Sequence, residues 1–239
     1  LDQRIEKLND KIAQFVQERL SSLADPAKAV EMAAYMKTDM PFYGVQKPDR
    51  LPIIQDLKRD FKPSSLAEYH DNILSLWRQP KREEKYLAIN YAELFPQFIT
   101  IDSLPLYEQM VREGAWWDYT DSVASHLTGP VLLANEADVR PIVDGYVDDS
   151  DFWIRRTALL SHLGHKKNTS FKHLFIYCRK LAPEKEFFIR KAIGWALREY
   201  SKSEPARVKQ FLAENKGKLS ALSYNEGAKH LIKVGAMKG

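Results

Sequence analysis

The sequence predicts an all-α fold, specifically an α-solenoid of stacked helical hairpins. Apolar residues recur at the i, i+3, i+4, i+7 spacing of amphipathic helices along most of the 239 residues. The 10 Gly and 12 Pro fall mainly between these periodic stretches, where they punctuate rather than interrupt them. No pair of alternating Val-, Ile- and Thr-rich strands with a hairpin turn occurs.

The periodic stretches follow one another with short loops between them. We predict helices over residues 2–23, 26–37, 47–60, 64–78, 82–95, 103–113, 117–128, 136–147, 151–164, 169–181, 184–201, 204–214 and 219–233. Asp25-Pro26 and Ser203-Glu204-Pro205 place a capping side chain just before a proline, which the first helical turn tolerates. Ser64 precedes its helix in the same manner.

Two-helix units recur at roughly 35–40 residues, a spacing typical of HEAT-like repeats. The chain therefore has room for about six such repeats in a single domain over residues 1–239. Stacked hairpins form a concave surface, and we expect the late, basic helices to line it.

Charge is distributed unevenly along the chain. Residues 150–239 carry 19 Lys and Arg against 7 Asp and Glu, whereas residues 1–149 carry 17 against 25. A basic half joined to an acidic half favours one face that meets a polyanion, although Lys and Arg that only solubilise helices explain the counts equally well.

Several classes of protein are excluded or disfavoured. No apolar run approaches the roughly 18 residues of a membrane span, and the first 20 residues lack a signal-peptide core, so we expect a cytoplasmic location. The lone Cys178 excludes an internal disulfide and is expected to be a small buried apolar residue. The sequence has no HExxH, GxGxxG, GxxxxGK[ST] or GxSxG motif, and the pair His162 and His165 lacks a carboxylate at ligand spacing. We therefore expect neither a metal nor another cofactor.

The first candidate site is the segment Gly114–Val123. If a helix begins near Trp116, then Trp117 and Asp121 are neighbours on one face, at i and i+4. A Trp beside a carboxylate is able to form the wall of a small polar cleft. A packed Trp and a solvated or ion-paired acid are the alternative reading.

The second candidate lies on the helix over 184–201. Its apolar stripe is formed by Ile189, Ala192, Ile193, Ala196, Leu197 and Tyr200. Trp195 lies off that stripe, on the face of Lys191, Arg198 and Lys202, where cations would neutralise phosphates and the ring would pack on a sugar or base. Packing of Trp195 on the next repeat is the alternative, and the adjacent Gly194 indicates a close approach of some kind.

A third candidate follows the cap residues Ser150 and Asp151. The adjacent Arg155 and Arg156 project in two directions from a helix, so one of them is able to reach a phosphate. Surface charge explains them equally well.

Four stretches, in order along nearly the whole chain, point to one family. They are Met32-Ala33-Ala34-Tyr35-Met36-Lys37, Gly44-Val45-Gln46-Lys47-Pro48, Trp116-Trp117-Asp118-Tyr119-Thr120-Asp121, and Phe187-Phe188-Ile189-Arg190-Lys191-Ala192-Ile193-Gly194-Trp195-Ala196-Leu197-Arg198-Glu199-Tyr200. In these stretches the sequence resembles the bacterial DNA alkylation repair glycosylases of the AlkD type.

The resemblance implies a HEAT-like solenoid whose concave basic surface holds duplex DNA. It implies hydrolysis of the N-glycosidic bond of cationic lesions such as 3-methyladenine and 7-methylguanine, without insertion of the base into a pocket. Asp121 corresponds to the catalytic carboxylate, and Trp117 and Trp195 to the tryptophans that face the deoxyribose. Residues matching DNA-contacting or cleft positions are Arg156, Arg198, Tyr35 and Gln46.

The residues agree with that chemistry. An alkylated purine already carries positive charge, so it leaves without a general acid, and one carboxylate takes the place of the usual two. Because Asp121, Trp117 and Trp195 are all retained, we expect an active, monomeric DNA glycosylase that binds duplex DNA containing alkylated bases. The alternative is a non-enzymatic helical-repeat scaffold that binds nucleic acid or a protein partner.

Overall fold

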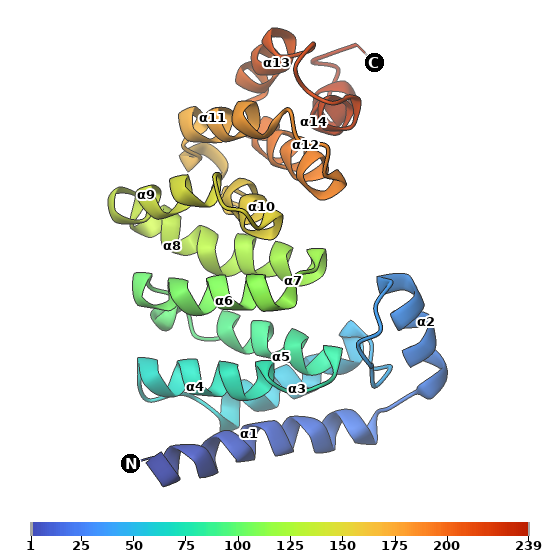
Figure 1. Cartoon of the computed structure of the whole chain (residues 1–239), viewed down its shortest axis with the longest axis vertical. Coiled ribbons are helices and arrows are strands. Elements are labelled where there is room, and N and C mark those ends of the chain that lie inside the picture. Colours follow the sequence, from blue (N-terminus) through green and yellow to red (C-terminus); the bar gives the residue numbers. More distant parts are fainter. Residues whose placement is uncertain (1, 239) are drawn as a thin grey trace. The chain divides into compact units, whose positions relative to one another are not determined.

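The computed structural model describes residues 2–238, with side chains described from residue 11 onward. Helices form all the regular structure of these residues, which confirms the predicted all-α class (Figure 1). The internal contacts divide the chain into two compact units, unit 1 over residues 1–99 and unit 2 over residues 100–239. The single domain over 1–239 stays a prediction.

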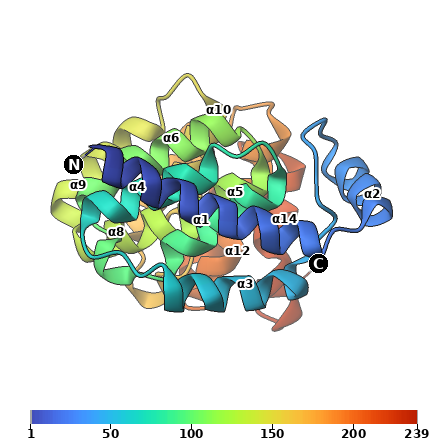
Figure 2. The same cartoon turned by 90° about the horizontal axis from the view of Figure 1, so that it is seen from below.

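Unit 1 is a layer of helices around α1. Its elements are α1 (Asp2–Ser22), α2 (Pro26–Met36), α3 (Lys47–Asp60), α4 (Leu66–Trp77), α5 (Arg82–Glu93) and the 3-10 turn η1 (Pro96–Phe98). Helix α1 packs on α3, α4 and α5, and Figure 2 shows it crossing the unit with α3 beside it. Its stripe of Ile12, Val16 and Leu20 is completely buried. Burial of such a side chain contributes roughly 1.5–3 kcal/mol, so this stripe is a main support of the unit.

One buried carboxylate fixes the segment between α2 and α3. Glu83 of α5 is fully buried and accepts hydrogen bonds from the backbone N–H of Tyr43 (3.0 Å), Gly44 (2.8 Å) and Val45 (3.0 Å). Gly44 has a φ of +87°, and a Cβ there would lie 2.0 Å from the carbonyl oxygen of Asp25. The motif Gly44-Val45-Gln46-Lys47-Pro48 is therefore a rigid turn that ends with exposed Gln46 at the N-cap of α3.

Within unit 2, helices are stacked in sequence order (Figure 1). Its elements are η2 (Ile101–Ser103), α6 (Leu104–Gly114), α7 (Trp117–Ser122), the π-helix η3 (Val123–Thr128), α8 (Gly129–Ala134), α9 (Glu136–Tyr146), α10 (Phe152–Leu160), η4 (Lys166–Asn168), α11 (Phe171–Leu181), α12 (Phe187–Ser201), α13 (Pro205–Glu214) and α14 (Ala221–Lys233). Helix α10 is central to the packing of this unit, because it contacts α6, α7, η3, α9, α11 and α12.

The structure corrects the predicted helix over 117–128. Regular α-helix ends at Ser122, a π-helical turn follows over Val123–Thr128, and α8 then begins at Gly129. The pair Gly129-Pro130 normally marks a break, but the first turn of a helix needs no N–H from Pro130. Gly129 also allows close packing, because a Cβ there would lie 2.7 Å from the carbonyl oxygen of Ser161. Single π-turns within helices are rare, and those that occur often lie at functional sites.

The histidine pair considered in the sequence is structural. His162 and His165 are buried, and the Nε2 of His162 lies 3.2 Å from a guanidinium nitrogen of Arg140. The same nitrogen of Arg140 donates to the Tyr177 hydroxyl. Burial and the Arg140 charge lower the pKa of His162 to about 3, so this imidazole is neutral and accepts from Arg140.

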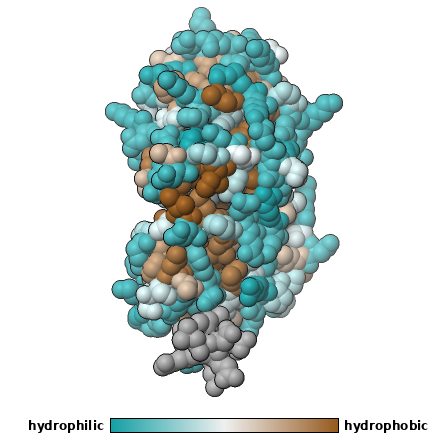
Figure 3. All heavy atoms as spheres, turned by 60° about the vertical axis from the view of Figure 1, so that its left-hand side comes forward, coloured by the Kyte–Doolittle hydropathy of each residue, from teal (hydrophilic) through white to brown (hydrophobic). Residues whose placement is uncertain are grey.

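The face turned forward in Figure 3 carries many hydrophilic side chains, and apolar side chains gather among them in patches of different size. Large hydrophobic side chains that remain exposed in unit 2 include Leu133, Ile142 and Ile176. No helix among the described residues has the length and apolar character needed to span a membrane.

We expect Gly44→Ala to destabilise the protein by about 2 kcal/mol or more, because the new methyl group meets backbone in a conformation that L residues avoid. Gly145→Ala is the matched control, since a Cβ at that exposed position of α9 meets nothing within 4 Å. It should leave stability unchanged or raise it by up to about 1 kcal/mol. Urea unfolding monitored by circular dichroism measures both. Equal stability of the two variants would contradict the role of Gly44.

Candidate active site

A buried ion pair lies at the centre of the candidate site. The Asp121 carboxylate on α7 accepts two hydrogen bonds from the Arg156 guanidinium on α10, from Nε to Oδ1 (2.7 Å) and from Nη2 to Oδ2 (2.9 Å). The Arg156 side chain is 3% exposed and that of Asp121 is 15% exposed. The guanidinium is therefore enclosed, while the carboxylate keeps an opening to solvent.

Arg156 also joins the pair to α12. Its Nη1 donates a hydrogen bond to the carbonyl oxygen of Phe188, in the first turn of α12. The Arg156 guanidinium carbon also lies 5.9 Å from the centroid of the Phe188 ring. That ring packs in turn on Trp153 (4.9 Å) and Trp116 (6.0 Å), centroid to centroid. One buried arginine thus connects α7, α10 and α12.

Both arginines predicted as possible phosphate contacts form hydrogen bonds and ion pairs within the protein. Arg155 forms a bidentate pair with Glu184 (2.6 and 3.0 Å) and donates to the Asp149 carbonyl. Arg156 faces Asp121 in place of the solvent expected for a DNA-contacting side chain. The physical reason is that a buried guanidinium needs acceptors for its donors, and Asp121 and Phe188 supply them.

The environment of Asp121 changes its acidity. Burial raises the pKa of this carboxyl above its ordinary value, and a weaker contribution from the charge of Asp118 acts in the same direction. The hydrogen bonds and charge of Arg156 oppose the rise. A carboxylate that is desolvated and held by one cation is a group prepared to interact with a second, developing positive charge.

The two candidate tryptophans lie on the elements that Arg156 connects. Trp117 precedes Asp121 by one turn of α7 and is partly exposed. Trp195 follows Phe188 by two turns of α12, about 10 Å along the axis, and is also partly exposed. The stripe predicted for α12 is buried as expected, which leaves Trp195 off the core.

A residue that the sequence analysis missed organises the cations beside Trp195. Glu226 of α14 is 2% exposed and pairs with Lys191 (2.6 Å), Lys229 (2.8 Å) and Arg198. Burial alone would raise the pKa of this carboxyl, but these partners outweigh it and lower the pKa to about 2. Three cations around one acid leave a net positive cluster whose cationic side chains remain partly exposed.

Gly194 makes this cluster possible. A Cβ at Gly194 would lie 2.5 Å from the Cβ of Glu226 and 2.9 Å from the carbonyl oxygen of Ser223, so only glycine lets α14 approach this closely. The close approach inferred from Gly194 is thereby identified as contact with α14. A sequence signal for Glu226 existed, because it is the single acid among the basic residues after Glu214.

The other predicted DNA contacts take no part in these ion pairs. Lys202 is exposed and pairs with Glu199. Tyr35, which is 77% exposed on α2, and Gln46 belong to unit 1. All three remain predictions.

Paired helices of unit 2 carry the acid Asp121, its partner Arg156 and two tryptophans outside the core. The protein is therefore a helical-repeat protein with a candidate active site in unit 2. The model of the family described as DNA alkylation repair enzyme matches residues 16–231. The chain belongs to this family, which gives it a role in DNA alkylation repair. The family resemblance expected from the sequence is thus confirmed.

Solved structures agree with this assignment. A structure described as a predicted DNA alkylation repair enzyme from Enterococcus faecalis is 30% identical, has a TM-score of 0.80, and matches over 88% of this chain and 97% of its own. AlkD2 from Streptococcus mutans is 18% identical, has a TM-score of 0.50, and matches over 76% of this chain and 97% of its own. The second likeness shows the fold alone. A search of curated protein sequences found no match.

We expect Asp121 and Arg156 to be strongly coupled in stability. Arg156→Ala leaves a buried carboxylate unpaired, which costs about 3–5 kcal/mol, whereas removal of both partners costs less than the two single losses together. A double-mutant cycle of Asp121→Ala and Arg156→Ala, followed by urea unfolding, measures the coupling. The pair Lys180 and Asp148, whose side chains are 49% and 63% exposed, is the control and should couple by less than about 1 kcal/mol. Coupling no larger than in the control would contradict the buried pair.

Proposed function

We propose that this chain is a monofunctional DNA glycosylase that acts as a monomer on duplex DNA. Its substrates are cationic alkylated purines such as 3-methyladenine and 7-methylguanine, and the bond it hydrolyses is the N-glycosidic bond. The single observation that carries the proposal is the desolvated Asp121 carboxylate, oriented on both oxygens by Arg156 yet open to solvent on one side.

The reaction needs little from the protein beyond charge stabilisation. The bond between C1′ and the purine nitrogen breaks with its electron pair passing to the purine, which neutralises the base. Positive charge develops on the deoxyribose, and Asp121 stabilises it electrostatically while orienting the water that attacks C1′. The proton lost by that water passes to Asp121 or to solvent.

Arg156 acts as a positioning residue in this proposal. Its two hydrogen bonds fix the plane of the Asp121 carboxylate, so no reorganisation is needed as charge develops. Trp117 and Trp195 offer ring faces to the sugar, and the negative face of an indole favours a cation. We assign both tryptophans to this contact.

The DNA-binding surface is formed by cations around Trp195. Lys191 and Arg198 are held by Glu226 at defined positions, and Lys202 continues the same face of α12. Such cations take the place of the counterions of DNA phosphates, so DNA binding at this surface is salt-dependent. Tyr35 and Gln46 of unit 1 are proposed separately as further DNA contacts.

We expect Asp121→Asn to lower the rate of base excision by about 10²–10³ while affinity for DNA is retained, because the variant keeps the shape of the side chain but not its charge. Release of 7-methylguanine from duplex DNA under single-turnover conditions measures the rate, and fluorescence anisotropy measures affinity. Because Asp121→Asn also weakens the pairing with Arg156, thermal unfolding checks that the variant remains folded. Equal excision by variant and parent would reject the role of Asp121, and a parent that binds DNA without releasing base would favour a non-enzymatic binder.

The rate should also depend on pH through Asp121. Only the ionised carboxylate stabilises positive charge, so excision falls as pH decreases through the Asp121 pKa. Because burial raises that pKa, the midpoint of the fall should lie above the ordinary value of about 3.9. The single-turnover rate, corrected for spontaneous depurination at each pH, tests this expectation. A rate that stays flat down to about pH 4 would contradict it.

We expect Arg198→Ala to weaken DNA binding and to reduce the slope of log affinity against log salt by about one. Lys180→Ala is the control, since it also removes one positive charge but lies on α11, where Lys180 pairs with Asp148. Anisotropy titrations at several salt concentrations give both slopes. An unchanged slope for Arg198→Ala would remove this residue from the proposed surface.

A further inference from the structure

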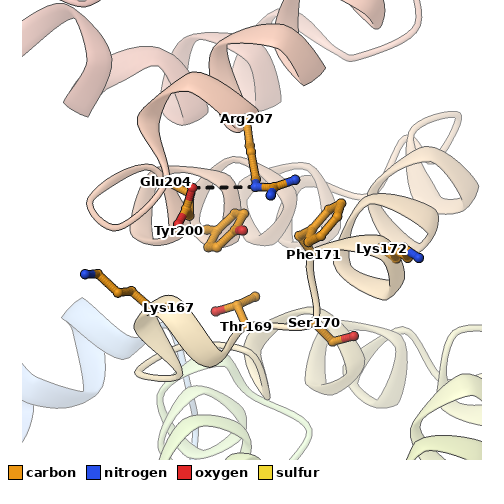
Figure 4. Close-up of a pocket in the computed structure, with 8 residues that line it drawn as sticks. All are labelled: Lys167, Thr169, Ser170, Phe171, Lys172, Tyr200, Glu204 and Arg207. Atoms are coloured by element: carbon orange, nitrogen blue, oxygen red, sulfur yellow. Dashed lines mark ion pairs between the residues drawn. The ribbon is translucent and has the colours of Figure 1, made fainter.

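A pocket of about 360 Å³ opens in unit 2, between the turn that joins α10 to α11 and the turn that joins α12 to α13 (Figure 4). None of the residues of the Asp121–Arg156 pair or of the Glu226 cluster lines it. The pocket is therefore a separate feature of this unit, and the proposed glycosylase chemistry does not use it.

The lining of the pocket is positively charged. Three cations, Lys167, Lys172 and Arg207, line it together with one acid, Glu204. Glu204 forms an ion pair with Arg207 at 3.5 Å, and the Arg207 guanidinium lies over the Phe171 ring, 4.2 Å from its centroid. Figure 4 shows Arg207 directed into the pocket while Lys167 and Lys172 extend to its two sides. Arg207 is thus the cation at the centre and the lysines are at the rim.

The first turn of α11 adds backbone donors to this charge. The helix runs over Phe171–Leu181, and its N-cap residue Ser170 makes no capping hydrogen bond with the first-turn N–H groups. The Ser170 hydroxyl lies instead 2.9 Å from Nδ1 of His173. N–H groups in the first turn of a helix have no acceptor within the helix, and they favour an anion.

The pocket also contains the hydroxyl of a largely buried tyrosine, Tyr200. Tyr200 is 4% exposed and lines the pocket, yet among the described residues its hydroxyl makes no hydrogen bond. Figure 4 shows the Tyr200 side chain between Arg207 and Thr169, facing the open space. Because the ring is held in the core and the hydroxyl has no partner among the described residues, this hydroxyl is available to donate to a group in the pocket.

The acids near the pocket do not cancel its charge. Glu204 is shared with Arg207, and Glu136, which lies near Ser170, pairs with Arg140 at 2.9 Å. A cation, the first residues of α11 and a hydroxyl line one space, and together they offer a donor set suited to a phosphate group.

We propose that this pocket binds a phosphate group through Arg207, the first turn of α11 and the Tyr200 hydroxyl. Two sources carry this chemistry, a phosphate of the DNA backbone and a free phosphate or nucleotide. The proposal is independent of base excision, because it concerns binding at residues outside the candidate active site.

The test uses the full chain and two probes, inorganic phosphate and a short undamaged DNA duplex. Tyr200→Phe removes only the hydroxyl, which has no partner in the protein, so the fold should be kept, and thermal unfolding checks this. Arg207→Gln removes the central cation. Lys209→Gln is the matched control, because it removes the same charge from the same helix α13 at a position that does not line the pocket.

Calorimetric titration with phosphate and anisotropy titration with DNA give the outcomes. We expect Tyr200→Phe and Arg207→Gln to weaken phosphate binding by about tenfold and Lys209→Gln to leave it nearly unchanged. A parallel loss of DNA affinity in the two pocket variants identifies the DNA backbone as the source. Loss of phosphate binding with DNA affinity intact identifies a free phosphate or nucleotide. If neither probe binds more weakly to Tyr200→Phe and Arg207→Gln than to the control, the proposal is overturned.

Discussion

The arrangement of the candidate site depends on one buried guanidinium. Arg156 donates to both oxygens of Asp121 and to the Phe188 carbonyl, and so fixes α7, α10 and α12 with respect to one another. A buried charge is tolerated only when its partners have good geometry, since desolvation costs several kcal/mol per ion. The interaction therefore contributes specificity of arrangement more than net stability. Any helix shift that breaks it leaves two desolvated charges unpaired.

Two carboxylates in unit 2 have opposite pKa shifts because their surroundings differ. Glu226 has three cationic partners and a pKa lowered to about 2, so it is a permanent anion that holds Lys191, Arg198 and Lys229 together. Asp121 has one cationic partner and a raised pKa, and it keeps an opening to solvent. The first environment suits a structural counter-ion, and the second suits a group that meets new positive charge during a reaction.

Local sequence patterns predicted most of the helices because capping residues and apolar spacing act over short distances. The helix over 47–60 was placed at its observed bounds, and Asp25 and Asp151 act as N-caps. Two capping predictions were wrong: the N-cap of α4 is Ser65 and not Ser64, and Glu204 before α13 makes no side-chain capping hydrogen bond. The π-helical turn before Gly129 was not predictable in the same way. It depends on how closely α10 approaches, since the Ser161 carbonyl leaves no room for a side chain at position 129.

By itself, the sequence determined the all-α class, the buried stripe of α12, the family, and the candidate residues Trp117, Asp121 and Trp195. These follow from periodicity and from motifs in which every residue is a near neighbour along the chain. Only the tertiary structure decided that Arg156 faces Asp121, that Glu226 gathers the cations, and that Gly194 admits α14. Except for Lys229, which is three residues from Glu226, these ion-pair partners lie 28–35 residues apart in the sequence. The choice of partner for a charged side chain is a matter of burial and geometry, and no local pattern encodes it.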